Sequence, residues 1–177
     1  MKRFAFISLM CLLSIGNIFA QHLRWEMDED RNYKIPVGPC LWTDLMQADF
    51  FYIVREHDIN NILNAEATVA LAQAMESMPD TKFEMEAFFG AWEEESLAQL
   101  SRFYAFVMTM EYKYQQPITY LFYGCNRDYD CGCNEEPKSM PYYKLYKVTD
   151  GQRTLIGEIL EKPEVSFEDD VLKFIKR

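Results

Sequence analysis

Histidine is nearly absent from this chain, which has only His22 and His57 among its 177 residues. The sequence also lacks the G-x-S-x-G, H-E-x-x-H, P-loop and G-x-G-x-x-G patterns of common hydrolases, zinc proteases and nucleotide-binding enzymes. His57 lies between Glu56 and Asp58, but adjacent residues on a helix point in different directions, so we expect no carboxylate-oriented base there. We therefore predict no catalytic residues and no cofactor.

Basic residues are few relative to acidic ones. The chain has 18 Lys and Arg against 28 Asp and Glu, which gives a formal charge of −10. Such a surface repels phosphate backbones and anionic lipid, so nucleic acid is not an expected partner. It attracts basic partners instead.

Long apolar runs are confined to the first 20 residues. Lys2 and Arg3 precede the apolar run Phe4–Leu13, and the small residue Ala20 comes just before Gln21. These features are the three parts of a secretory signal peptide. A spanning helix needs about 20 apolar residues, and this run is much shorter. We therefore expect cleavage, a secreted or periplasmic location and no transmembrane segment.

Four cysteines follow the predicted leader: Cys40, Cys125, Cys131 and Cys133. An even number in an exported chain indicates two disulfides. Because a ring between cysteines separated by one residue is usually strained, we expect Cys131 and Cys133 to pair with Cys125 and Cys40. A redox pair is disfavoured because acidic neighbours raise thiol pKa values. A zinc site is disfavoured because the spacing lacks a C-x2-C knuckle.

The polar loop that holds three of these cysteines has oxygen-bearing side chains at alternate positions. Asn126, Asp128 and Asp130 are followed by Gly132, a pattern typical of Ca²⁺ loops. The glycine comes one position late, and Pro137 stands where a bidentate Glu would be expected. These three residues are therefore weak calcium candidates, and a disulfide-bonded loop is the favoured interpretation.

The middle of the chain is predicted to be helical. Apolar residues recur at helical spacing over residues 58–79 and again over 81–114. The second stretch is either one helix or two helices divided at Gly90 and the Glu93–Glu95 run. The short turn between the two stretches predicts antiparallel packing. Residues 41–57 fit either a helix or a buried strand, and we favour a helix. Residues 21–40 contain two prolines and a glycine and are expected to be irregular.

Strands are predicted only in the last third, over residues 118–123, 142–148 and 154–160, with an Asp-Gly hairpin between the last two. Ser166 and the acids after it predict a final helix. The expected fold class is therefore α+β, with N-terminal antiparallel helices packed on a small C-terminal antiparallel β-sheet and a closing C-terminal helix. We divide the chain into a signal peptide (1–20), an irregular segment (21–40) and a single domain (41–177).

From Ile118 onward, the order strand, loop, Pro141, strand, Asp-Gly turn, strand and helix resembles the C-terminal half of thioredoxin-like proteins. The resemblance covers about a third of the chain and implies that Pro141 is a cis-proline. The W-C-x-x-C motif of that family is missing, because Gly38-Pro39-Cys40 matches only its second half. The exchange chemistry of the family is therefore not implied for this chain.

The favoured function is that of a non-catalytic, disulfide-bonded binding protein. Tyr142 and Tyr146 point to one face of a predicted strand. Packing within the sheet is the favoured use of these rings, and the alternative is an exposed tyrosine surface beside acidic residues, which suits contact with a protein or a glycan. One alternative is a thioredoxin-related thiol–disulfide oxidoreductase with a degenerate motif. A second alternative is a protein with a calcium-binding loop.

Overall fold

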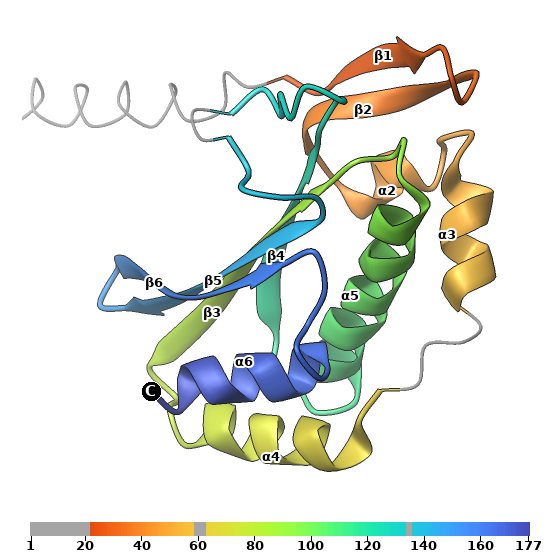
Figure 1. Cartoon of the computed structure of the whole chain (residues 1–177). Helices are drawn as coiled ribbons and strands as arrows, with labels where there is room; N and C mark the ends of the chain where they lie inside the picture. The colour runs from red at the N-terminus through yellow and green to blue at the C-terminus, as the bar shows by residue number, and fades with distance from the viewer. Residues whose placement is uncertain (1–21, 59–62, 134–135) are drawn as a thin grey trace, which may run out of the picture.

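The computed structural model describes residues 22–58, 63–133 and 136–177 (Figure 1), and the predicted signal peptide at 1–20 lies outside them. In chain order, the elements are β1 (Arg24–Asp28), β2 (Tyr33–Cys40), α2 (Trp42–Leu45), α3 (Phe51–Asp58), α4 (Ala65–Glu76), β3 (Thr81–Phe89), α5 (Glu94–Tyr112), β4 (Ile118–Gly124), β5 (Tyr142–Thr149), β6 (Gln152–Leu160) and α6 (Phe167–Ile175).

The strands form one mixed sheet in the order β1-β2-β4-β3-β5-β6. Strands β3 and β4 are parallel, whereas every other neighbouring pair is antiparallel. The expected fold class is therefore wrong in its order and in its sheet, because strands begin at residue 24, before any described helix. The sheet is larger than predicted and is not purely antiparallel.

The main correction concerns residues 81–89, which we expected to begin a long helix and which form the central strand β3. Phe83, Met85 and Ala87 are buried, whereas Glu84 and Glu86 between them are half-buried. This alternation has the period of a strand. Residues 88–92 carry no polar side chain apart from the indole N–H of Trp92. Residues 81–92 therefore also fit the apolar spacing of a helix.

Residues 21–40 are not irregular as expected, because they contain the hairpin β1–β2. Pro36 pairs with β1 only and Pro39 pairs with β4 only. Each proline therefore pairs with a neighbouring strand on one side only. The other side of the proline needs no ladder hydrogen bond, so the missing N–H is tolerated there. Gly38 lies between them with φ +113°, a conformation that favours glycine.

The predictions for the first helices are confirmed in part. Residues 41–57 do contain helices, α2 and α3, as favoured. Helix α4 begins after Asn64, whose side chain accepts a hydrogen bond from Ala67 N (3.2 Å), and not after Asp58, the last residue of α3. The predicted antiparallel pair is also wrong, since α4 lies beside α6 and α3 lies beside α5 (Figure 1).

The three strands and the final helix predicted for the last third are present, although β4 pairs with β2 and β3 and not with β5. Strands β5 and β6 are joined at Asp150 and Gly151, both with positive φ as a tight hairpin requires. Ser166 caps α6 by accepting a hydrogen bond from Asp169 N (3.2 Å). The Met140–Pro141 peptide bond is cis, as the resemblance to thioredoxin-like proteins implies.

The main core lies between the sheet and the four longer helices, which gather on one side of it (Figure 1). Its centre is a cluster of aromatic rings: Phe103, Phe122, Tyr143 and Phe167. A smaller cluster lies on the opposite face, where the cysteine loop covers Phe88 and Tyr142. The sheet is therefore covered by helices on one face and by that loop on part of the other.

Candidate functional site

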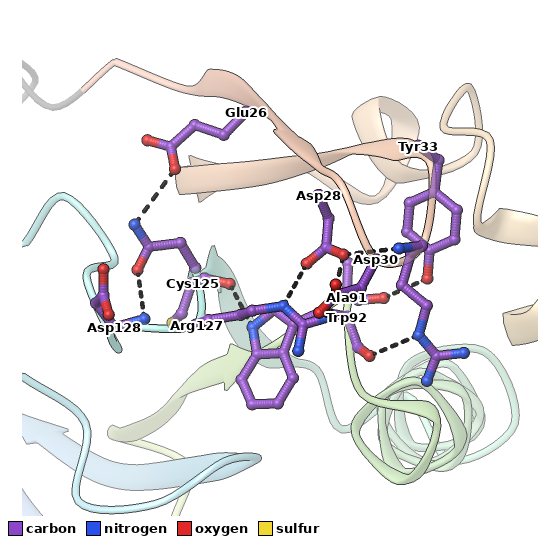
Figure 2. A network of polar contacts seen from close by, with 11 residues as sticks. Glu26, Asp28, Asp30, Tyr33, Ala91, Trp92, Cys125, Arg127 and Asp128 are labelled. Atoms are coloured by element: carbon purple, nitrogen blue, oxygen red, sulfur yellow. Dashed lines mark hydrogen bonds and ion pairs between the residues drawn. The ribbon is translucent and has the colours of Figure 1, made fainter.

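The carboxyl ends of the parallel strands β3 and β4 meet at one edge of the sheet. In sheets with parallel strands, this edge is the usual place for a ligand site. Here it is formed by residues 28–33 of the β1–β2 turn, residues 90–93 and residues 125–131, which we call the loop face (Figure 2).

Trp92 is the side chain that joins these three segments. Its indole N–H donates a hydrogen bond to the carbonyl oxygen of Cys125 (3.2 Å), and the guanidinium of Arg127 lies over its ring at 5.4 Å. Its own carbonyl oxygen accepts a hydrogen bond from Arg31 Nε (3.0 Å). The loop face is therefore fixed by contacts between residues far apart in the sequence.

Asp28 is the buried anion of this network, with 5% of its surface exposed. It accepts hydrogen bonds from Arg127 Nε (2.8 Å), Arg127 Nη2 (3.0 Å) and the backbone N–H of Arg31 (2.9 Å) (Figure 2). The Arg127 side chain, with help from the Arg31 N–H, holds the pKa of Asp28 below its ordinary value against the effect of burial. Beside it, the hydroxyl of Tyr33 donates to Ala91 O (2.7 Å).

A second carboxyl lies at the start of α5. Glu93 is the N-cap residue, and its Oε2 atom is buried with no hydrogen-bond partner among the described residues. Burial raises the pKa of Glu93, and the charges of Glu95 and Glu161 raise it further. Glu161 also donates its N–H to the carbonyl oxygen of Pro141 (2.7 Å).

The start of α5 lies inside the parallel unit of the sheet. Strand β3, helix α5 and strand β4 form the parallel unit that precedes the cis-proline and the last hairpin. The chain at this point has the sequence Trp92-Glu93-Glu94-Glu95-Ser96. Glu93 and Ser96 are separated by two residues, and neither side chain contains sulfur.

The helical interpretation of residues 81–114 does not single out the start of α5, because it places helix on both sides of Gly90. The Ser96 hydroxyl has a structural partner, because its Oγ accepts the N–H of Gly90 (2.9 Å).

The cysteines are not joined as expected. The disulfide connects Cys131 to Cys133, whose Cα atoms are 5.3 Å apart, because Gly132 between them adopts φ +61°, which closes the turn. Cys40 and Cys125 are free thiols and are buried. Burial raises the pKa of both, that of Cys125 to about 12, so neither is a reactive thiolate near neutral pH.

The three calcium candidates use their oxygens mainly within the loop. Asn126 Oδ1 accepts the N–H groups of Asp128 (3.0 Å) and Asp130 (3.1 Å). Asp130 accepts the N–H of Gly132 (2.7 Å) and pairs with Arg24, and these two contacts, in that order, lower the pKa of Asp130. Across the described part of the chain, no three His, Cys, Asp or Glu side chains are grouped as metal ligands. This geometry gives the calcium alternative no support.

Comparison with known proteins adds no relative. No protein-family model matches the chain, and no match was found among curated proteins or solved structures.

The Asp28–Arg127 contact predicts a specific stability effect. Replacing Asp28→Asn should lower the free energy of unfolding by about 2 kcal/mol at pH 7, because it weakens three hydrogen bonds to a buried carboxylate. Because the folded pKa of Asp28 is lowered, its contribution is present above the unfolded value of about 3.9 and is lost as the pH falls further.

Urea unfolding of both proteins between pH 3 and pH 7 measures this difference. Asp30→Asn is the matched control, because Asp30 also pairs with Arg127 but its side chain is 77% exposed. The control should change stability by less than about 0.5 kcal/mol. Equal effects of the two substitutions, or a difference that does not shrink in acid, would contradict this interpretation.

Proposed function

We propose that this protein is an exported, non-catalytic binding domain that uses a thioredoxin-like framework and recognises a partner through its loop face. The observation that carries the proposal is the order of β3, α5, β4, the cis-proline and the last hairpin. In this proposal, a W-C-x-x-C motif would align with Trp92-Glu93-Glu94-Glu95-Ser96, so Glu93 and Ser96 stand in place of exchange cysteines. The two free thiols are buried elsewhere, with raised pKa values. The framework is thus retained without the residues that perform thiol–disulfide exchange.

Export is supported by the sequence pattern of residues 1–20 and by the disulfide in the cysteine loop. Within the described ranges, no helix combines the length and apolar character that a membrane crossing requires. We propose a secreted or periplasmic location on these grounds.

The loop face supplies the chemistry for a basic protein partner. A groove of about 260 Å³ is lined by Arg127 and five acidic side chains: Glu26, Asp28, Glu29, Asp30 and Asp128. Tyr129, which is 37% exposed, lies edge-on to Trp92 at 6.5 Å. An aromatic pair beside exposed carboxylates suits Lys and Arg side chains of a protein. A glycan partner would depend on the same rings.

Introducing cysteines at positions 93 and 96 tests the proposal that the protein is not catalytic. The variant Glu93→Cys/Ser96→Cys should catalyse the reduction of insulin disulfides by dithiothreitol, because a dithiol at a helix N-terminus has lowered thiol pKa values. The wild type should be inactive, and Glu93→Ala/Ser96→Ala is the control for loss of the native side chains. A non-catalytic role would be contradicted if the wild type reduced insulin and the variant Cys131→Ser/Cys133→Ser did not.

Reversing charges on the loop face tests the binding half. Glu29 and Asp128 are exposed, so Glu29→Lys/Asp128→Lys should leave the fold intact and sharply reduce recovery of the protein partners that the wild type captures from extracytoplasmic fractions. Glu56→Lys/Glu111→Lys makes the same charge change at exposed positions on α3 and α5. Equal losses in both variants would show that only net charge matters and would remove the loop face as the binding surface.

A further inference from the structure

We propose that the disulfide of the cysteine loop exchanges within the molecule: the thiol of Cys125 displaces Cys133 from its bridge to Cys131, and Cys133 is left as a free thiol. All three residues lie in or against the small apolar cluster on the sheet face opposite the helices. A thiol and a disulfide in one cluster are the two reactants of thiol–disulfide exchange. The inference concerns the covalent state of the loop and does not depend on the function proposed above.

A tight turn places Cys125 opposite Cys131. The N–H of Tyr129 donates to Asn126 O (3.1 Å), and the N–H of Asn126 donates to Asp130 O (3.0 Å). Tyr129 has φ +64°, as the last residue of a three-residue hairpin loop requires. The next opposed pair is therefore Cys125 and Cys131. Such pairs have Cα atoms about 4.5 Å apart in regular antiparallel strands, within the range of about 4.4–6.8 Å that a disulfide spans.

The two side chains also lie on the same side of this turn. Cys125 is fully buried and Cys131 is 2% exposed, and both belong to the cluster that contains Phe88 and Tyr142. Cys40, the other buried free thiol, belongs to the main core instead. Cys125 is therefore the thiol that is placed to attack the bridge.

The exchange is a single displacement without net oxidation. Cys125 loses its proton to solvent, and its thiolate attacks Sγ of Cys131. The bond between the sulfurs of Cys125 and Cys131 forms while the bond between Cys131 and Cys133 breaks. The electron pair leaves on the sulfur of Cys133, which takes up a proton from solvent. The described chain keeps one disulfide and two free thiols throughout.

Burial makes the step slow and its product distinct. It raises the pKa of the Cys125 thiol to about 12, so the thiolate is rare near neutral pH. Cys133 is half-buried, whereas Cys125 is fully buried. The exchange therefore replaces a thiol that reagents do not reach with one that is nearer to solvent. In that state Cys133 is the site where a small disulfide reagent attaches.

Disulfide mapping of the purified wild type measures the exchange. Trypsin cleaves after Arg127, so the bridge Cys131–Cys133 stays within one peptide, whereas Cys125–Cys131 joins two peptides. The folded protein is incubated at about pH 8.5 to increase the thiolate fraction, then denatured at mildly acidic pH with N-ethylmaleimide and digested. The linked pair should rise with time to at least about 1% of molecules, the population of a minor state, with the maleimide on Cys133.

Matched substitutions of the two buried thiols are the controls. Cys125→Ala should abolish the labelling of Cys133. Cys40→Ala should leave both the linked peptides and the labelling unchanged, because Cys40 lies in the main core. Equal labelling of Cys133 in the wild type and in Cys125→Ala would overturn the proposal, because the label would then come from a reduced bridge.

Cys133→Ala keeps the proposal testable if Cys125→Ala does not fold, because Cys133 is only half-buried. Without its competitor, the Cys125–Cys131 bridge should form when the folded variant is oxidised with glutathione disulfide. Failure to form this bridge would overturn the proposal. So would a wild type that contains only Cys131–Cys133 after its bridge is reduced and formed again in a glutathione buffer. None of these results bears on partner capture at the loop face.

Discussion

The parallel pairing of β3 with β4 is the constraint on which the rest of the structure depends. Adjacent parallel strands need a crossover connection, and α5 supplies it on the helix-covered face. Phe103 of α5 packs against Phe122 of β4 and Tyr143 of β5, which fixes the helix over the centre of the sheet. The start of α5 is thereby forced to the edge where β3 and β4 end. Trp92 and Glu93 lie at the loop face for this reason.

Noncovalent contacts hold the loop face to the sheet, where we had expected disulfides to do so. Asp28 and Arg127 connect the first hairpin to the cysteine loop, and Trp92 connects both to α5 (Figure 2). The disulfide closes only a local turn between Cys131 and Cys133. The site is therefore an outcome of tertiary packing around one buried carboxylate, Asp28.

Local features were the predictable part of this fold. The hairpin at residues 150–151 and the helix after Ser166 depend on a turn and a cap, both written in neighbouring residues. Residues 81–89 satisfied two periods at once, and only pairing with β4 and β5 decides between them. The site could not be predicted because Asp28 and Arg127 are 99 positions apart. A residue pattern within one segment contains no information on such a contact.

The two proposals use different consequences of the same framework. The loop face lies beyond the ends of the parallel strands, and the cysteine cluster packs on Phe88, near the end of β3. Both depend on residues 81–89 being a strand. Nuclear Overhauser contacts in the isotope-labelled protein test directly whether residues 81–89 form a strand. We expect cross-strand contacts between Met85 and Tyr120. A continuous series of strong contacts between successive amide protons along residues 81–89 would show a helix and contradict the account.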